Sequence, residues 1–184
     1  MPLFPVFIEL TGRPVLVVGG GKVAARKVKQ LLPFKPEVTL VSPKATPELR
    51  ELAKRKVIKW KRRAFRPSDL RGKLLVVLAT DDARLQARVS KLCKEKGILC
   101  NAVDAPEHCS FIFPSLVRRG ELVVGISTSG KVPALSRALR EKLEELLPEE
   151  LGRLVTELER ARSSGVRGEE LLELARRRLG EVLR

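Results

Sequence analysis

The sequence is poor in several residue types on which particular classes of small protein depend. It has no tyrosine and an aromatic content of 4%, so it offers few platforms on which the bases of a single-stranded nucleic acid could stack. Its three cysteines form no CxxC pair, which favours reduced, mostly buried thiols over a disulfide framework. The single histidine, His108, and its neighbour Cys109 lack the three or four ligands that a held metal ion needs. We therefore expect no nucleic-acid partner and no bound metal.

Long apolar runs are also missing. No stretch approaches the roughly 18 apolar residues of a membrane span, and the N-terminus (Met1 to Pro5) lacks the basic start and apolar run of a signal peptide. We expect no membrane partner and a cytoplasmic location. The hydrophobic content of 43% is still enough for a packed core, which argues against global disorder.

Positive charge is in excess, with a formal net charge of +15. Such a field attracts polyanions of any kind, including nucleic acids and small polycarboxylates. A third interpretation is thermal adaptation, since 32% of the residues are charged while the sequence holds one asparagine, two glutamines and one methionine. The charge alone does not choose among these explanations.

Apolar runs alternate with helical patterns along the first part of the chain. Arg13 to Val18 predicts a strand, followed by three glycines and a helix over Lys22 to Leu32. Further strands are predicted at Val38–Val41, Lys73–Ala79 and Ile98–Val103, and further helices at Pro47–Lys56 and Ala83–Lys96. This alternation predicts an α/β fold with a Rossmann-type, doubly wound parallel sheet.

After Phe113-Pro114 the pattern changes. A strand is predicted over Leu122–Ser127, a long helix opens near Pro133, and a last helix covers Glu169–Arg184. An apolar stripe runs through this helical region and includes Leu143, Leu151 and Leu158. Because the stripe carries no convergent polar groups, it is typical of a core or a dimer seam rather than of a ligand site.

The sharpest motif is Gly19-x-Gly21-x-x-Ala24, placed between a predicted strand and the helix that follows. In such a motif the first glycine allows a tight turn, the second lets the backbone approach a pyrophosphate, and the third small residue lets helix and strand pack closely. The context therefore predicts a dinucleotide on the helix N-terminus. The second strand ends in Ser42-Pro43-Lys44 instead of the usual acid. The residues therefore leave open whether the preferred dinucleotide is NAD or NADP.

Three of the four aspartates follow predicted central strands, at the edge where open α/β sheets bind ligands. We expect Asp81 and Asp82 to cap the next helix and Thr80 to lie near the cofactor. Asp104 is followed by no helical pattern, and a carboxylate at that edge could take a proton as a hydride leaves a substrate.

A rival motif is Gly125-x-x-x-x-Gly130-Lys131, which nearly completes the phosphate-binding loop of nucleotide hydrolases. Val132 stands where a hydroxyl must bind magnesium, and Pro133 follows, so we reject this class. We expect Ser127, Thr128 and Ser129 to form the turn and cap of the next helix, whose N-terminus could hold a substrate carboxylate.

Taken together, these segments resemble the precorrin-2 dehydrogenase family, the stand-alone counterpart of the N-terminal half of siroheme synthase. The matching segments run in order over about residues 2 to 148: Pro2–Phe4, Val17–Lys27, Ala79–Asp82, Asn101–Asp104, Ser110–Ser115 and Ile126–Leu135.

The resemblance implies NAD-dependent oxidation of precorrin-2 to sirohydrochlorin by an intertwined homodimer. With the change of pattern after Phe113-Pro114, we expect an NAD-binding domain over 1–113, a dimerisation region over 114–148 and a C-terminal helical domain over 149–184. Asp104 matches the family's catalytic aspartate. The cofactor contacts that the resemblance implies are Gly21, Lys22, Val23, Ser42, Pro43 and Lys44. The glycine motif and the end of the Lys73–Ala79 strand add Gly19 and Thr80 to these expected contacts.

The resemblance also offers an explanation of the charge, because precorrin-2 bears acetate and propionate groups that a basic cleft would attract. We expect substrate contacts at Ser127, Thr128 and Lys131, and further basic candidates are Arg118, Arg119, Arg137 and Arg140. Some family members also insert iron, and the residues leave that activity open here. The alternative function is a non-catalytic Rossmann module that senses redox state or binds nucleic acid.

Overall fold

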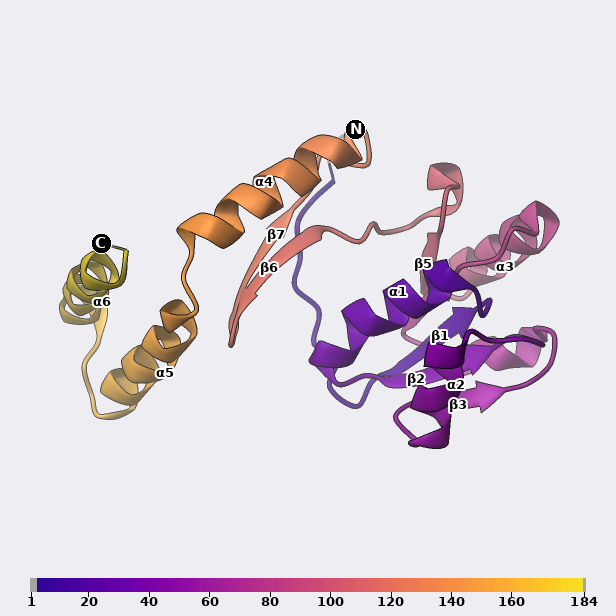
Figure 1. The fold of residues 1–184 in the computed structure, drawn as a ribbon, viewed down its shortest axis with the longest axis horizontal. Helices are drawn as coiled ribbons and strands as arrows, with labels where there is room; N and C mark the ends of the chain where they lie inside the picture. The colour runs from indigo at the N-terminus through magenta and orange to yellow at the C-terminus, as the bar shows by residue number, and fades with distance from the viewer. Residues whose placement is uncertain (1–2, 184) are drawn as a thin grey trace. The chain divides into compact units, whose positions relative to one another are not determined.

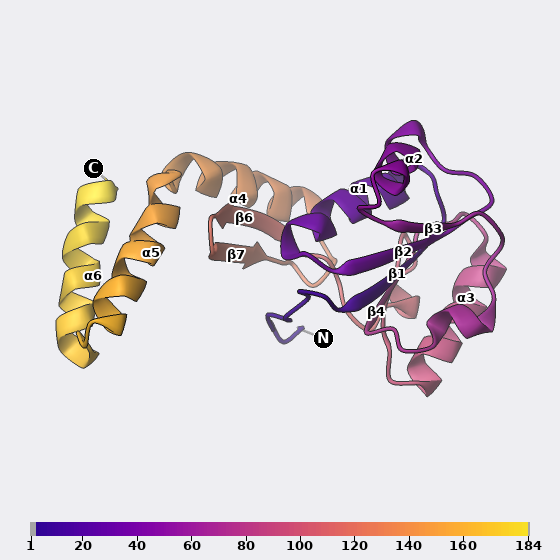
Figure 2. The ribbon, with the colours of Figure 1, turned by 90° about the horizontal axis from the view of Figure 1, so that it is seen from below.

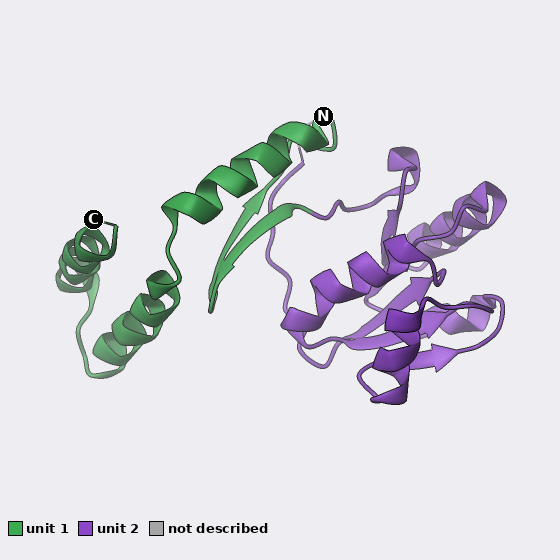
Figure 3. Cartoon of the chain, viewed as in Figure 1, with its two compact units in different colours: residues 1–2, 114–184 green, residues 3–113 purple. Residues whose placement is uncertain are grey.

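The computed structural model describes residues 3–183, which fall into two compact units. One unit is Leu3–Phe113 and the other contains the residues from Pro114 onward (Figure 3). Each unit has its own sheet. Within residues 3–183, no helix combines the length and the apolar character needed to cross a bilayer.

The first unit is built on a five-stranded parallel sheet with the order β3-β2-β1-β4-β5 (Figure 1). Its strands are β1 (Pro14–Val18), β2 (Glu37–Val41), β3 (Lys59–Lys61), β4 (Leu75–Leu78) and β5 (Leu99–Ala102). Residue Val17 in the central strand pairs with Leu40 on one side and Val77 on the other. This strand order and pairing confirm the predicted Rossmann-type parallel sheet.

Helices cover both faces of this sheet, as a doubly wound fold requires. Figure 2 shows α1 (Lys22–Leu31) and α2 (Pro47–Lys54) on one side of the sheet and α3 (Ala83–Glu95) on the other. Val28 of α1 packs with the side chains of one face, and Val89 of α3 packs with those of the other. Short 3₁₀ turns complete the connections at η1 (Leu32–Phe34), η2 (Pro67–Leu70) and η3 (Pro106–His108).

The second unit combines an antiparallel hairpin with three helices. Its elements are β6 (Ser115–Arg119), β7 (Leu122–Ile126), α4 (Pro133–Leu146), α5 (Glu150–Ser163) and α6 (Gly168–Val182). Arg119 holds the end of α4 against the hairpin, because its guanidinium donates hydrogen bonds to the carbonyls of Leu147 (2.6 Å) and Glu144 (2.8 Å). This structural role argues against Arg119 as a ligand of substrate carboxylates.

Both units leave large apolar side chains exposed. In the N-terminal segment Phe4 is 86% exposed and Phe7 is 79% exposed. On α4 the side chains of Leu135, Leu139 and Leu146 are also exposed. The α5 part of the predicted stripe is different, because Leu151 and Leu154 are buried.

Candidate dinucleotide-binding cleft

A cleft of about 640 Å³ opens at the carboxyl ends of the central strands of the first unit. It is lined by Gly19–Val23, Ser42, Ala79–Asp81, Ala83, Gln86, Val103–Ala105, Glu107 and His108. Six of the eight residues expected to contact a cofactor lie in this lining, and so does Asp104. Pro43 and Lys44 are exposed and follow Ser42 outside the lining.

The three glycines of the first turn have different surroundings. A Cβ atom added to Gly19, whose φ is +108°, would lie 1.9 Å from the Ala79 carbonyl oxygen. A Cβ added to Gly20 would lie 2.0 Å from the Lys44 carbonyl oxygen. A Cβ added to Gly21 would meet nothing within 4 Å. Gly19 and Gly20 are therefore required by the fold, whereas Gly21 keeps open the space that a ligand would fill.

The N-terminus of α1 faces this space without a cap of its own. Gly21, at the N-cap position, has no side chain to accept from the first-turn N–H groups, and the first turn contains no acidic residue. The backbone N–H groups of Lys22 and Val23 are thus left for an acceptor from outside the helix. Such an end attracts anions, so the turn fits the pyrophosphate of a dinucleotide.

The segment after β2 is tied to the glycine turn. The backbone N–H of Thr46 donates to the Gly20 carbonyl (2.9 Å), and the N–H of Gly19 donates to the Val41 carbonyl (3.0 Å). Ser42 lies between these contacts and is buried. Ser42 and the exposed Lys44 directly follow β2, the strand after which folds of this type carry a residue for the adenosine ribose.

The segments after β4 and β5 complete the cleft. Asp82 caps α3, as expected, because its carboxylate accepts from the Leu85 N–H (2.9 Å). Asp104 is exposed, has a φ of +60°, and accepts no hydrogen bond within residues 3–183. A non-glycine residue in this left-handed conformation is uncommon, and such residues cluster at functional sites.

The loop that carries Asp104 is held by side chains from its neighbourhood. The Cys109 thiol accepts from the Ala102 N–H (3.2 Å) and donates to the Ala102 carbonyl (3.2 Å). The Ser90 hydroxyl of α3 donates to the carbonyl of His108 (2.9 Å). Burial raises the pKa of the Cys109 thiol, which keeps it a neutral hydrogen-bonding group. Cys109 is therefore suited to hold the loop rather than to act as a nucleophile.

Two polar side chains in this region were not singled out from the sequence. Gln86 of α3 is 7% exposed, and its Nε2 donates to the carbonyls of Thr80 (2.5 Å) and Val103 (3.3 Å). Lys27 of α1 is half-buried with its Nζ 3.9 Å from the centroid of the Phe113 ring. Burial, together with the nearby charge of Arg26, lowers the pKa of Lys27 to about 8. The one signal for Gln86 was its rarity, since Gln30 is the other glutamine.

The predicted substrate residues belong to the second unit. The Thr128 hydroxyl accepts from the Val132 N–H (3.0 Å), and the Ser127 hydroxyl accepts from the Ser129 N–H (2.9 Å). These bonds form the turn that precedes α4, and Lys131 is exposed within it. Of the other basic candidates, Arg137 and Arg140 form ion pairs with glutamates of α4.

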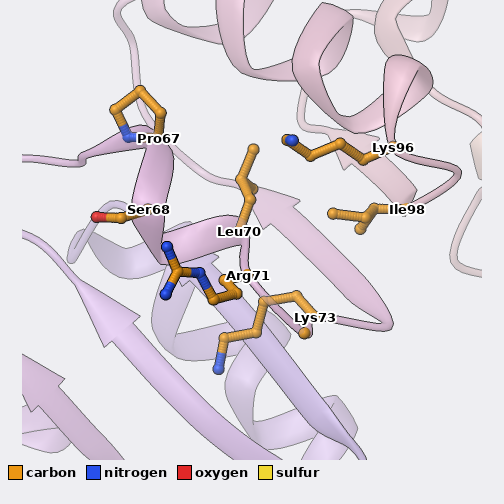
Figure 4. Close-up of a pocket in the computed structure, with 8 residues that line it drawn as sticks. Pro67, Ser68, Leu70, Arg71, Lys73, Lys96 and Ile98 are labelled. Atoms are coloured by element: carbon orange, nitrogen blue, oxygen red, sulfur yellow. The ribbon is translucent and has the colours of Figure 1, made fainter.

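A second hollow of about 420 Å³ lies near the amino ends of β4 and β5. It is lined by Pro67, Ser68, Leu70–Lys73, Lys96 and Ile98 (Figure 4). Its polar groups are mainly cations, and it contains none of the site residues predicted from the sequence. Across residues 3–183, no three His, Cys, Asp or Glu side chains gather as a metal site would require.

The strand order, the glycine turn and the cleft together define a dinucleotide-binding α/β protein. The chain belongs to the family described as "Putative NAD(P)-binding", whose model matches residues 6–115.

Three individual proteins illustrate the similarity. Siroheme synthase 1 of Aeromonas salmonicida is 48% identical over 152 residues, which are 83% of this chain and 32% of that protein. Siroheme synthase 1 of Serratia proteamaculans is 47% identical over 154 residues, which are 84% of this chain and 32% of that protein. The chain thus spans about a third of the length of these curated relatives. A solved structure named precorrin-2 dehydrogenase, SirC, matches with a TM-score of 0.75 and 28% identity, over 95% of this chain and 88% of that one.

Proposed function

We propose that this chain is a precorrin-2 dehydrogenase that oxidises precorrin-2 to sirohydrochlorin with NAD, in the formation of siroheme. The observation that carries the proposal is the position of Asp104. This exposed residue has a left-handed backbone conformation and places a carboxylate in the lining of the cleft. The similarity to siroheme synthases and to a precorrin-2 dehydrogenase supports the choice of substrate.

The reaction removes a hydride and a proton from the substrate. NAD supplies the acceptor for the hydride when it is bound. Asp104 acts as the general base, because a carboxylate within hydrogen-bond reach can accept the proton as charge develops. Lys22 and Val23 bind the pyrophosphate through their backbone N–H groups, while Ser42, Pro43 and Lys44 contact the adenosine half.

Substrate binding is assigned to the turn at the start of α4. Ser127, Thr128 and Lys131 combine hydroxyl groups, a cation and a helix N-terminus, all of which suit a carboxylate. The net charge of +15 favours a substrate with several carboxylates. We propose precorrin-2 rather than nucleic acid or a membrane as the partner, and the cytoplasm as the location.

A homodimer is part of the proposal, with 1–113 binding NAD, 114–148 forming the dimerisation region and 149–184 a helical domain. Its support is the exposed apolar surface of α4, where Leu135, Leu139 and Leu146 lack cover in one chain. Light scattering at low micromolar concentration tests it, and a monomeric mass would contradict it.

The deciding experiment replaces Asp104 and follows precorrin-2 oxidation anaerobically by absorbance. Asp104→Asn keeps a residue that tolerates the left-handed conformation, so the loop should be preserved. We expect turnover to fall by roughly 10²- to 10⁴-fold, while NAD affinity is retained. Ferrous iron added to the product then tests for iron insertion.

Turnover within a few-fold of the parent would place the base elsewhere. If the parent protein binds DNA in a salt-sensitive manner and does not oxidise precorrin-2, the alternative of a non-catalytic Rossmann module is favoured instead.

A further inference from the structure

Gln86 joins two segments of the cleft that are distant in the sequence. It lies in the first turn of α3, and its Nε2 reaches the Thr80 carbonyl after β4 and the Val103 carbonyl after β5. Long side chains near a helix start point back toward the N-terminus, which here is the carboxyl edge of the sheet. Gln86 therefore holds together the backbone on which Thr80 and Asp104 are placed.

The same two bonds fix the orientation of the amide. A backbone carbonyl accepts hydrogen bonds and donates none, so the group that faces both carbonyls must be the NH₂ of the side chain. The oxygen of the amide then points away from them. Within residues 3–183, Oε1 accepts no hydrogen bond, although Gln86 lines the cleft. An acceptor of fixed direction is thus left for a ligand.

The order of the strands indicates which part of a dinucleotide lies beside this acceptor. The pyrophosphate fits the turn after β1, and the adenosine position follows β2. Because β4 and β5 lie on the other side of β1 from β2, the segments after β4 and β5 border the remaining half of the ligand. That half is the nicotinamide riboside, whose carboxamide carries an NH₂ donor.

We propose that Gln86 binds the nicotinamide half of the dinucleotide, with Oε1 accepting a hydrogen bond from the carboxamide NH₂ while Nε2 positions the segments that carry Thr80 and Asp104. The inference rests on the proposed function only in that the cleft binds NAD. It assigns to Gln86 the recognition of the nicotinamide, separately from the adenosine recognition at Ser42 and Lys44.

The test measures the binding of three ligands to the full chain by calorimetry: NADH, ADP-ribose, and the reduced 3-acetylpyridine analogue of NADH, in which a methyl group replaces the carboxamide NH₂. Gln86→Met has a similar shape but no amide. Loss of a buried hydrogen bond should weaken NADH binding roughly 10-fold, with ADP-ribose affinity unchanged. The parent should discriminate against the acetylpyridine analogue by a similar factor, and Gln86→Met should not.

Gln30→Met is the matched control, because Gln30 is an exposed glutamine of α1 outside the cleft, and all three affinities should stay at parental values. Should Gln86→Met fold poorly, Gln86→Glu gives a second test, since its carboxylate would face two carbonyl oxygens and should weaken NADH more than ADP-ribose. The proposal would be overturned if Gln86→Met lost as much affinity for ADP-ribose as for NADH. It would also be overturned if the parent protein bound the acetylpyridine analogue as tightly as NADH. A parent protein that binds neither NADH nor ADP-ribose would refute the NAD site itself. NADH binding without precorrin-2 turnover would refute only the dehydrogenase function.

Discussion

Gly152 of α5 packs directly against Gly120, the first of the two residues between β6 and β7. A Cβ atom added to Gly152 would lie 3.0 Å from the Gly120 nitrogen, and one added to Gly120, whose φ is +58°, would lie 3.2 Å from the Gly152 Cα. The contact joins two backbones, so a side chain between them cannot move aside. The absence of both side chains is therefore what lets α5 lie against the hairpin.

This contact predicts that Gly152→Ala destabilises the second unit by about 1–3 kcal/mol, because overpacking outweighs the better helix propensity of alanine. Gly180→Ala on α6 is the control, since a Cβ there meets nothing within 4 Å. That substitution should stabilise the protein by about 0.5–1 kcal/mol. Chemical denaturation measures both, and equal effects of the two variants would contradict the packing argument.

Substitutions of Gly21 and Gly19 in the first turn should have different effects, one on ligand binding and the other on stability. Gly21→Asp should keep the fold, because the added side chain enters open space, but its carboxylate would repel the pyrophosphate. We expect NADH affinity to fall by about 100-fold or more. Gly19→Ala should instead lower the free energy of unfolding by about 2 kcal/mol or more, through its clash with Ala79 and its positive φ. Unchanged NADH affinity in a folded Gly21→Asp protein would remove the basis of the site.

Asp69 is predicted to stabilise the fold in a pH-dependent way. It is 2% exposed, its carboxylate accepts two hydrogen bonds from Arg63 (2.7 and 2.8 Å), and it accepts another from Lys61 (2.8 Å). The Arg63 hydrogen bonds in particular hold the pKa of Asp69 well below its usual range. The stabilisation is therefore complete above the unfolded pKa of about 3.9 and is lost progressively as the pH falls below it.

Asp69→Asn should lower the free energy of unfolding at pH 7 by about 1.5–3 kcal/mol, and this difference from the parent should shrink as the pH falls below about 4. Glu157→Gln is the control, because it removes an exposed, solvent-screened ion pair with Arg178 and should change stability far less than Asp69→Asn. Urea denaturation at several pH values separates the two cases. A pH-independent deficit in Asp69→Asn would show that shape rather than charge matters.

Lys27 should have the opposite effect on stability at neutral pH. Its pKa in the folded chain is about 8, mainly because of burial, while the unfolded value is about 10.4. Between these values the unfolded chain binds a proton that the folded chain has released, so this residue makes stability rise with pH. Below pH 8 the folded chain carries the buried charge.

We therefore expect Lys27→Met to be more stable than the parent at pH 7, and we expect this advantage to vanish by about pH 10.5. Lys29→Met, an exposed position on the same helix, should show no such pH-dependent gain. Thermal unfolding midpoints across the pH range are the measurement. A Lys27→Met protein that is less stable at pH 7 would mean that the contact with the Phe113 ring outweighs the burial of the charge.

The parts of the fold that were predicted correctly have strong local patterns. The runs around Val17 and Val77 are apolar because both faces of these strands are covered. By contrast, β3 and β6 were missed. In β3 the Lys59-Trp60-Lys61 segment is short and charged because it forms the edge of its sheet, and β6 ends in two arginines.

The residues of the candidate site also divide into those that the sequence predicted and those that it did not. Gly19, Ser42, Thr80 and Asp104 were placed together because the carboxyl ends of parallel strands share one edge. The side chains that support the site, among them Gln86, Lys27 and Cys109, lie within helices or beyond strand ends and contact residues of other segments. No local pattern predicts such contacts, because they depend on how α1, α3 and the loop after β5 pack against the sheet.

The hydrogen bond from Thr46 to the Gly20 carbonyl has a consequence for attempts to redesign the dinucleotide preference of the chain. It joins the Gly19–Gly21 turn to the segment that contains Ser42 and Lys44, so a displacement of one segment is transmitted to the other. A substitution made after β2 to exchange NAD for NADP would also displace the Gly19–Gly21 turn, on which we propose that the phosphates common to both ligands bind. A variant with an altered preference between NAD and NADP should therefore also bind both dinucleotides more weakly. A change of coenzyme would need compensating substitutions near Thr46.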